Sequence, residues 1–490
     1  MLTGAIAATG PDSDSPKPSA RRWWSPQPNV TGRGILAGYS AKFWLLVIAI
    51  GIAAGVGASA FMGLLKLSEH LAYGYRRGPY LDGLNVGSGI HRVIVLLLAG
   101  VIVGVGVTVL HRLPISGGAE ISEALWLHGA RLPFVASIAR GALSIVTIGM
   151  GVSLGREAAP QLAGAATASW LAEWAQLPQW QRRLLVASGA GAGFAAVYNV
   201  PLAGALFALE VLLGTVALPL VLPALAMSVT ATAVAWITLG TAHTYHMPTY
   251  NLKAAQMVWA LVAGPLIGVA AVVWVRLIER ASSLRPKHRG RFVAPLVVFG
   301  LLGVVSIQYP QLLGNGKEIV QVAVLGGYSL GLSAILLALK PLATAGCLGA
   351  GALGGLFTPT LSIGVLLAGV LEGIWSHIWP GTVPGSYALI GGAAFLGAAM
   401  QGPLSAVVLV LELTRHFDLL MAPTLVAVTI ATVTARRLGA GSIYSARLRP
   451  DPYAAGGSTA AAAIATLDAP QDGSRFEDEP DTVKQRRRPG

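Results

Sequence analysis

The sequence predicts an all-α integral membrane protein in which many tilted and broken helices form two repeats. Of its 490 residues, 54% are hydrophobic and only 11% are charged, whereas roughly 25% are charged in soluble domains. Uncharged runs such as residues 43–65, 93–110 and 254–275 reach the ~18–20 residues that span a bilayer as a helix. The 61 Gly and 29 Pro interrupt these runs, so re-entrant helices that line a cavity or lie within protein are expected.

Polar composition at both ends sets the expected domain boundaries. Residues 1–40 are expected to be a polar, disordered segment and residues 451–490 a disordered tail, because neither carries enough apolar surface to pack. Residues 41–450 are expected to form one transmembrane transport domain, with repeats at roughly 41–245 and 246–450.

The net charge of +13 fits the positive-inside rule better than nucleic-acid binding, because the basic residues lie beside apolar runs. The densest basic block, at residues 276–291, is expected in the cytoplasm. The chain is therefore expected in the cell membrane as a multi-pass protein, with lipid as a partner and no nucleic acid. Its one cysteine, Cys347, provides no disulfide framework, and no cofactor is expected.

The most informative stretch is residues 149–160, in which Arg156 and Glu157 are the only charges. A carboxylate at membrane depth costs ~3 kcal/mol or more, so it indicates function by default. The glycines before it are expected to end one helix and residues 158–172 to form another, which would place Glu157 at a helix N-terminus. Free N–H groups there attract negative charge. We therefore expect an anion and the carboxylate to compete for one site.

A second segment of interest is residues 113–120. Pro114 and the glycines that follow are expected to end the preceding helix, with Ser116 as a candidate N-cap of the next helix and Glu120 in its first turn. Helix capping alone would explain this segment. An anion-binding role for Ser116 gains support only from the other motifs.

Two patterns recur in the same order at nearly the same offset. The spacing in residues 155–160 recurs in residues 354–359, an offset of 199, and Pro201 to Glu210 recurs as Pro403 to Glu412, an offset of 202. Internal repeats with interrupted helices at corresponding positions are typical of transporters, with the pathway at the repeat interface. We expect Glu210 and Glu412 to pack or to bind N–H groups at helix ends rather than to contact the ion.

Ser116, Glu157, Phe357 and Tyr444 are the candidate site residues. Ser116 and Tyr444 offer hydroxyl groups. Glu157 and Phe357 lie where Gly- and Pro-bounded helices are expected to begin. Donors without a fixed cation suit a small anion such as chloride, whereas a metal cation would need carboxylates or carbonyls. The pair His243 and His246 has metal-compatible spacing, but it lacks a third ligand nearby, so no metal is expected.

These motifs resemble the CLC family of chloride channels and proton/chloride exchangers. The resemblance covers roughly residues 40–450 and rests on residues 115–119, 155–160, 199–210 and 354–359 and on a late tyrosine. It implies a helical homodimer in which each subunit has two inverted halves and its own pore. It also implies that Ser116 and Tyr444 coordinate the central anion, that Glu157 is the external gate, and that the backbone at Leu356 and Phe357 lines the pathway. The serine at 116 resembles the chloride-preferring version.

Val211 departs from the exchangers, which usually carry an internal proton-transferring glutamate at this position. Valine cannot bind a proton, so the sequence favours a voltage- or pH-gated chloride channel. A proton/chloride antiporter is the alternative, with Glu210 or Glu123 as a substitute acid. An intramembrane enzyme that uses Glu157 as acid or base is an alternative of another class. It would need a partner acid, histidine or metal at membrane depth, which the apolar runs hardly offer, so no enzyme is expected.

Overall fold

The computed structural model describes residues 39–74, 78, 80–110, 120–250, 252–286, 288–381, 383–415 and 420–447. All of them belong to one compact unit, Gly38–Arg449. Most of the predicted N-terminal segment, 1–40, and the whole predicted tail, 451–490, lie outside the described residues.

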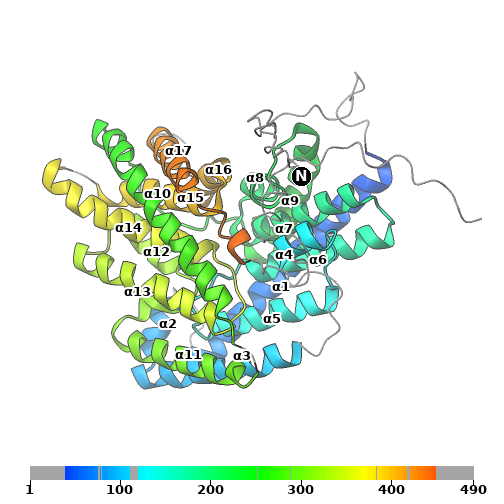
Figure 1. Cartoon of the computed structure of the whole chain (residues 1–490), viewed down its shortest axis with the longest axis horizontal. Coiled ribbons are helices and arrows are strands. Elements are labelled where there is room, and N and C mark those ends of the chain that lie inside the picture. The colour runs from blue at the N-terminus through cyan, green and yellow to red at the C-terminus, as the bar shows by residue number, and fades with distance from the viewer. Residues whose placement is uncertain are drawn as a thin grey trace, which may run out of the picture. The chain divides into compact units, whose positions relative to one another are not determined.

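Helices make up this unit, as Figure 1 shows. Apart from one isolated bridge between Gly155 and Gly355, the described residues contain no strand pairing. The predicted all-α class is therefore confirmed. The elements are α1 Ala41–Tyr73, α2 Tyr80–Val86, α3 Gly89–Leu110, α4 Ile121–Leu127, α5 Phe134–Gly149, α6 Ala158–Trp174, α7 Gln179–Tyr198, α8 Pro201–Leu206, the π-helix η1 Phe207–Leu212, α9 Leu218–Leu239, α10 Ala254–Ser283, α11 Gly290–Gln308, the 3₁₀ turn η2 Pro310–Leu312, α12 Lys317–Val324, α13 Leu330–Gly349, α14 Phe357–Ile378, α15 Pro384–Met400, α16 Pro403–Thr414, α17 Met421–Arg437 and the 3₁₀ turn η3 Ser445–Arg447.

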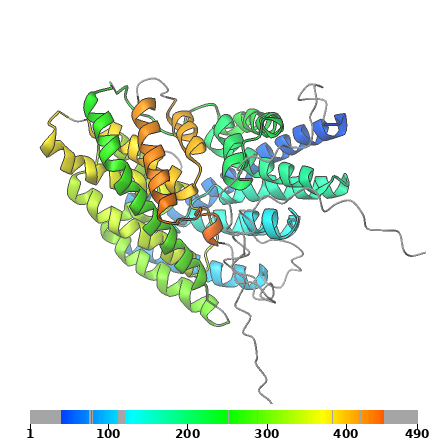
Figure 2. The ribbon, with the colours of Figure 1, turned by 45° about the horizontal axis from the view of Figure 1, so that its top comes forward.

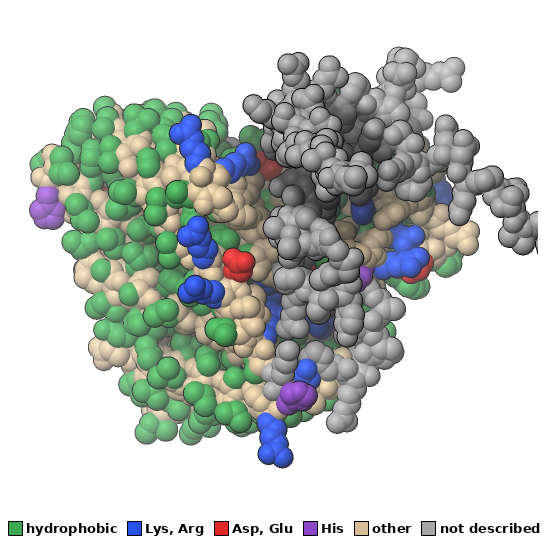
Figure 3. All heavy atoms as spheres, in the orientation of Figure 1, with side chains coloured by type: hydrophobic (Ala, Val, Ile, Leu, Met, Phe, Trp, Pro, Cys, Tyr) green, Lys and Arg blue, Asp and Glu red, His purple; other side chains and the backbone are tan. Residues whose placement is uncertain are grey.

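Seven helices in the described part are long and apolar enough to cross a membrane: α1, α3, α9, α10, α11, α13 and α14. Their outward faces carry large apolar side chains, such as Ile94, Val105, Val273, Val297 and Leu342. Figure 3 shows such side chains covering most of the left-hand face, over the second-half helices, with few charges among them. An apolar surface of this extent fits a protein embedded in lipid, because soluble monomeric proteins expose only small apolar patches.

The helices break at corresponding places in the two halves. The chain leaves helical geometry between α5 and α6 and again between α13 and α14, with Gly151 and Gly351 at φ of 107° and 100°. It breaks again after α7 and after α15, where Asn199 and Gln401 are left-handed caps with φ of 58° and 60°. Such breaks expose backbone N–H groups at the start of α6, α8, α14 and α16.

Each half supplies the cap for a helix of the other half. The Glu210 carboxylate accepts hydrogen bonds from the backbone N–H groups of Leu404 and Ser405, at 3.1 and 2.6 Å. The Glu412 carboxylate likewise accepts from Leu202 and Ala203, at 3.2 and 2.6 Å. The prediction that these glutamates bind N–H groups at helix ends is confirmed.

Helices α6 and α7 pack closely because glycines face each other. A Cβ atom built on Gly164 would run into the carbonyl oxygen of Gly189, and one built on Gly193 would run into that of Pro160. Small residues let backbones approach in membrane proteins, where packing rather than the hydrophobic effect drives helix association. This contact fixes the start of α6, and hence Glu157, against α7.

Figures 1 and 2 show how the halves are arranged. Helices α4–α9 gather on one side and α10–α17 on the other, while α3 from the first half packs along α11 from the second. The short orange turn η3 lies between the two groups. The breaks before α6 and α14 meet between the halves, as the bridge between Gly155 and Gly355 shows.

Candidate functional site

Glu157 is the N-cap residue of α6, so the predicted position at a helix N-terminus is confirmed. Its carboxylate, however, makes no capping bond to α6. It crosses to the other half, where Oε1 accepts a hydrogen bond of 2.7 Å from the backbone N–H of Phe357, the first residue of α14. The side chain is buried, at 1% exposure. The carboxylate thus occupies the kind of place that a helix N-terminus offers to an anion.

Two glycines hold the segments beside the carboxylate together. The N–H groups of Gly155 and Gly355 each donate to the carbonyl oxygen of the other residue, both at 2.7 Å. A Cβ atom on either glycine would collide with the carboxyl group of Glu157. Glycine is therefore needed at both positions for Glu157 to reach Phe357.

Two hydroxyl groups complete the surroundings of the carboxylate. The Tyr198 hydroxyl lies 3.2 Å from Oε2 of Glu157 and 2.6 Å from Oγ1 of Thr358. Oγ1 of Thr358 lies 3.5 Å from the same carboxylate oxygen. Both side chains are buried, so the carboxylate faces the Phe357 amide and two hydroxyl groups away from solvent, besides its own backbone N–H.

A chain of aromatic rings leads from this point to Tyr444. Phe357 packs on Phe194 with centroids 5.0 Å apart, Phe194 on Phe207 at 5.2 Å, and Phe207 on Tyr444 at 5.4 Å. Among the described residues, the buried hydroxyl of Tyr444 has no hydrogen-bond partner. A buried hydroxyl without a protein partner is available to a ligand. The structure thus brings Glu157, Leu356, Phe357 and Tyr444 into one region.

Ser116 lies outside the described residues, which resume at Glu120. The prediction that Ser116 is the N-cap of the following helix is wrong, because α4 begins at Ile121 and its N-cap is Glu120. Glu123 completes a capping box with Glu120. A glutamate and its partner three residues later can satisfy the first N–H groups of a helix, so the cap falls after the glycines rather than before them.

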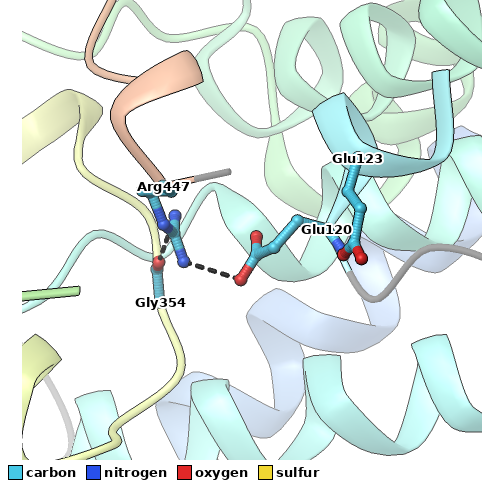
Figure 4. A network of polar contacts seen from close by, with 4 residues as sticks. All are labelled: Glu120, Glu123, Gly354 and Arg447. Atoms are coloured by element: carbon cyan, nitrogen blue, oxygen red, sulfur yellow. Dashed lines mark hydrogen bonds and ion pairs between the residues drawn. The ribbon is translucent and has the colours of Figure 1, made fainter. Parts of the chain in front are cut away.

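An ion pair and a hydrogen bond of Arg447 join three segments, as Figure 4 shows. The guanidinium of Arg447, in η3, donates to Oε1 of Glu120 at 2.9 Å and to the carbonyl oxygen of Gly354 at 3.3 Å. The Arg447 side chain is only 8% exposed and that of Glu120 27%. The pair therefore connects the turn that carries Tyr444 with the start of α4 and with the loop that leads to Phe357.

A buried lysine anchors the segment before Glu157. Lys340, in the middle of α13, is fully buried. Its Nζ donates to Oγ of Ser153 at 2.9 Å and to the carbonyl oxygens of Leu312 and Gly314, both at 3.0 Å. A buried polar group is tolerated when it is hydrogen-bonded, and here the bond to Ser153 holds the break between α5 and α6 against α13.

Val211 lies in the π-helix η1, beside Glu210. Its Cγ2 packs close to Gly402, at the start of α16. The Glu210 carboxylate also accepts from Oγ of Ser405 at 2.6 Å, in addition to two backbone N–H groups. Single π-helical turns often mark functional sites, but the acid in this one is bound on both oxygens.

Sequence reasoning missed Tyr198, Thr358, Lys340 and the pair Arg447–Glu120. The sequence does show Tyr198 at the end of a Gly- and Ala-rich stretch and Thr358 directly after Phe357. Either residue could have been noted as a polar group near the predicted site. Lys340 was visible as a lone charge before an apolar run. Their partners are distant in sequence, so the contacts themselves could not be read.

His243 and His246, for which no metal is expected, lie with their rings edge to face and the centroids 4.3 Å apart. Within the described ranges, no group of three or more His, Cys, Asp or Glu residues is arranged to hold a metal ion. The chemistry of the candidate site is therefore that of its amide, hydroxyl and carboxyl groups.

Comparison with known proteins identifies the family. Residues 99–436 match the family described as "Voltage gated chloride channel". A "Putative chloride channel protein ClcB-like" from Ralstonia nicotianae is 33% identical over 72% of this chain and 83% of that protein. A "Voltage-gated ClC-type chloride channel ClcB" from Salmonella dublin is 30% identical over 82% of this chain and 97% of that protein.

The fold also matches a solved structure. A structure titled "X-ray crystal structure of a slow cyanobacterial Cl-/H+ antiporter" superposes with a TM-score of 0.72 and 21% identity, covering 83% of this chain and 97% of that chain. The predicted resemblance is confirmed. The chain belongs to the CLC family of chloride transport proteins, and it is a multi-pass integral membrane protein.

Proposed function

We propose that the protein conducts chloride through a pore that the Glu157 carboxylate closes. The observation that carries this proposal is the bond between Oε1 of Glu157 and the N–H of Phe357, at 2.7 Å. The carboxylate occupies an anion position when it is ionised and leaves it when it is protonated, because the neutral acid gains less from N–H groups at a helix N-terminus.

The anion ligands along this pathway are Ser116, Tyr444 and the backbone at Leu356 and Phe357. The Tyr444 hydroxyl supports this assignment, because it is buried and has no hydrogen-bond partner in the described part of the chain. The position of Leu356 and Phe357 at the start of α14 supports it as well. Such donors favour an anion, whereas a cation would need carboxylate or carbonyl oxygens as ligands.

We propose a passive, gated channel rather than a proton-coupled exchanger. Val211 cannot relay a proton, and the neighbouring Glu210 holds three hydrogen bonds at the start of α16. Glu123 is engaged in the capping box of α4 and in a contact of 3.4 Å with His128. The relative with a solved structure is titled an antiporter, so exchange is the competing function.

An enzymatic role for Glu157 is the alternative of another class. Such an enzyme would need a partner carboxyl group, a histidine or a metal beside Glu157. The hydrogen-bond partners that the described side chains give its carboxylate are the hydroxyl groups of Tyr198 and Thr358 instead. We propose a gate rather than a catalyst.

We propose a homodimer in which the pores of the two subunits work independently. This rests on family membership. Cross-linking in mild detergent is expected to trap dimers, and trapping of monomers alone would contradict it.

The decisive experiment is chloride efflux from liposomes that contain the purified protein, with pH recorded simultaneously. The account predicts chloride loss without stoichiometric proton movement. If a proton gradient drives chloride uphill at a fixed ratio, the protein is an exchanger. If potassium leaves and chloride does not, the anion assignment is wrong.

A further inference from the structure

Three hydrogen-bond donors from other residues lie near the Glu157 carboxylate, and only one of them is a backbone N–H at a helix N-terminus. One oxygen binds the Phe357 amide at 2.7 Å, and the other faces the Tyr198 hydroxyl at 3.2 Å and the Thr358 hydroxyl at 3.5 Å. A carboxylate oxygen and a halide ion accept hydrogen bonds from the same kinds of donor. The contacts of the carboxylate therefore outline those of an anion in the same place.

We propose that the hydroxyl groups of Tyr198 and Thr358 are ligands of the transported anion at the position that Glu157 vacates, and that they favour chloride over larger halides. This inference rests on the proposed gating by Glu157. It adds two side-chain ligands on α7 and α14 to the backbone donor at Phe357.

The orientation of Thr358 argues for a ligand. Threonines in these helices commonly donate to the carbonyl four residues earlier, as Thr360 does to Leu356 at 2.6 Å and Thr414 does to Val410 at 2.8 Å. Thr358 is the second residue of α14, so the carbonyl four residues earlier, that of Gly354, lies before the helix, where it accepts from Arg447. The Thr358 hydroxyl points toward Tyr198 and Glu157, so it is available to a group in the pathway.

The Tyr198 ring is held so that its hydroxyl reaches the same point. It packs against Phe194 and Phe357, with centroids 5.1 and 5.4 Å away, and the Arg156 guanidinium lies 5.3 Å from its centroid. These contacts use the ring and leave the hydroxyl to Thr358 and Glu157. A buried, preorganised donor loses little entropy when it binds an ion.

The hydroxyl protons of Tyr198 and Thr358 can also be arranged to suit an anion. A single tyrosine proton cannot serve both neighbours, so when Tyr198 donates to Glu157, Thr358 donates to the Tyr198 oxygen. When the carboxylate leaves, both hydroxyls can turn toward the incoming ion, because hydroxyl protons rotate to suit their acceptors. The two groups therefore act as a coupled pair.

The expected selectivity follows from ion size. Coulomb attraction falls as the distance between charges grows, so each donor stabilises chloride more than the larger iodide. Loss of a hydroxyl is therefore expected to weaken chloride binding more than iodide binding. A purely structural role for the hydroxyls would not change this ratio.

The test uses the full chain with Glu157→Ala, which vacates the position, and measures chloride and iodide binding by titration calorimetry. Tyr198→Phe and Thr358→Val in this background are each expected to weaken chloride binding about tenfold, as expected for a hydrogen bond to a charged group. Thr358→Ser, which retains the hydroxyl, should stay within about twofold. The double variant should lose less than the product of the single effects, because the two groups are coupled.

Matched controls remove hydroxyls elsewhere. Tyr250→Phe deletes a hydroxyl that donates to Val324 at 2.6 Å, and Thr414→Val deletes one that donates to Val410 at 2.8 Å. Neither should change the chloride-to-iodide ratio. A symmetric elution peak in size-exclusion chromatography checks the folding of every variant.

Two results separate the inference from the proposed function. In the first, Glu157→Ala binds and conducts chloride, and adding Tyr198→Phe or Thr358→Val to it leaves chloride binding unchanged. This result refutes the hydroxyl ligands and leaves the proposed gate intact. If Glu157→Ala neither binds nor conducts chloride, both are overturned.

Discussion

The ion pair between Arg447 and Glu120 provides a quantitative prediction. Opposite charges 4 Å apart attract by about 4 kcal/mol at an effective dielectric constant of about 20. With exposures of 8% and 27%, part of that gain offsets the desolvation of both groups. We expect a net coupling of about 2 kcal/mol, or about 30-fold in an equilibrium constant. Because Arg447 follows Tyr444 closely and also binds Gly354, the coupling should affect the anion site.

The assay is a double-mutant cycle with Arg447→Gln, Glu120→Gln and the double variant. Each single variant should lower thermal stability and raise the chloride concentration that gives half-maximal flux in liposomes. The double variant should be little worse than either single variant. The control pair is Arg131 and Glu173, 3.7 Å apart and about 60% exposed, where the coupling should be at most about 0.5 kcal/mol.

Additive losses in the Arg447–Glu120 cycle would refute the reasoning. So would a stability loss in Arg447→Gln that leaves the half-maximal chloride concentration unchanged, because the pair would then stabilise the fold without positioning the site.

Four further predictions follow from other contacts. Glu210→Gln should cost about 1 kcal/mol of stability, measured by thermal unfolding, because it weakens the cap of α16; a gain or loss of proton coupling in flux assays would contradict its structural role. Lys340→Met should cost about 3 kcal/mol, because it leaves three acceptors without their donor; unchanged thermal unfolding would show that water replaces it. Gly355→Ala should raise chloride efflux at neutral pH, because its Cβ displaces the Glu157 carboxylate; efflux at the parent rate would mean that the carboxylate tolerates the methyl group. Val211→Glu should create proton-driven chloride movement that the parent lacks, and a parent that already shows it contains another proton route.

Local sequence patterns predicted much of the fold. The apolar runs at 43–65, 93–110 and 254–275 located α1, α3 and α10. Gly and Pro located the breaks before Ala158 and Phe357, because helix ends depend on nearby residues. The recurrence of Pro201 to Glu210 as Pro403 to Glu412 located the two glutamates that cap helices. It could not show that each glutamate caps a helix of the other half, since that exchange depends on tertiary packing.

The candidate site was predicted only in part. Glu157 and Phe357 were identified, because a buried acid and a helix start leave local signals. Tyr198 was not, because a tyrosine that ends a Gly- and Ala-rich helix is indistinguishable in sequence from a packing residue. Ser116 was assigned the wrong capping role, because the capping box of Glu120 and Glu123 competes for the same helix start.

Chloride efflux from liposomes with the parent protein and with Glu157→Gln, each measured across a range of pH, tests the central claim most directly. Glutamine resembles the protonated acid and cannot ionise, so it cannot compete as a charged group for the Phe357 amide. The account predicts that the parent conducts in a pH-dependent manner and that Glu157→Gln conducts at every pH without that dependence. A variant that conducts with the pH dependence of the parent would show that Glu157 is not the gate.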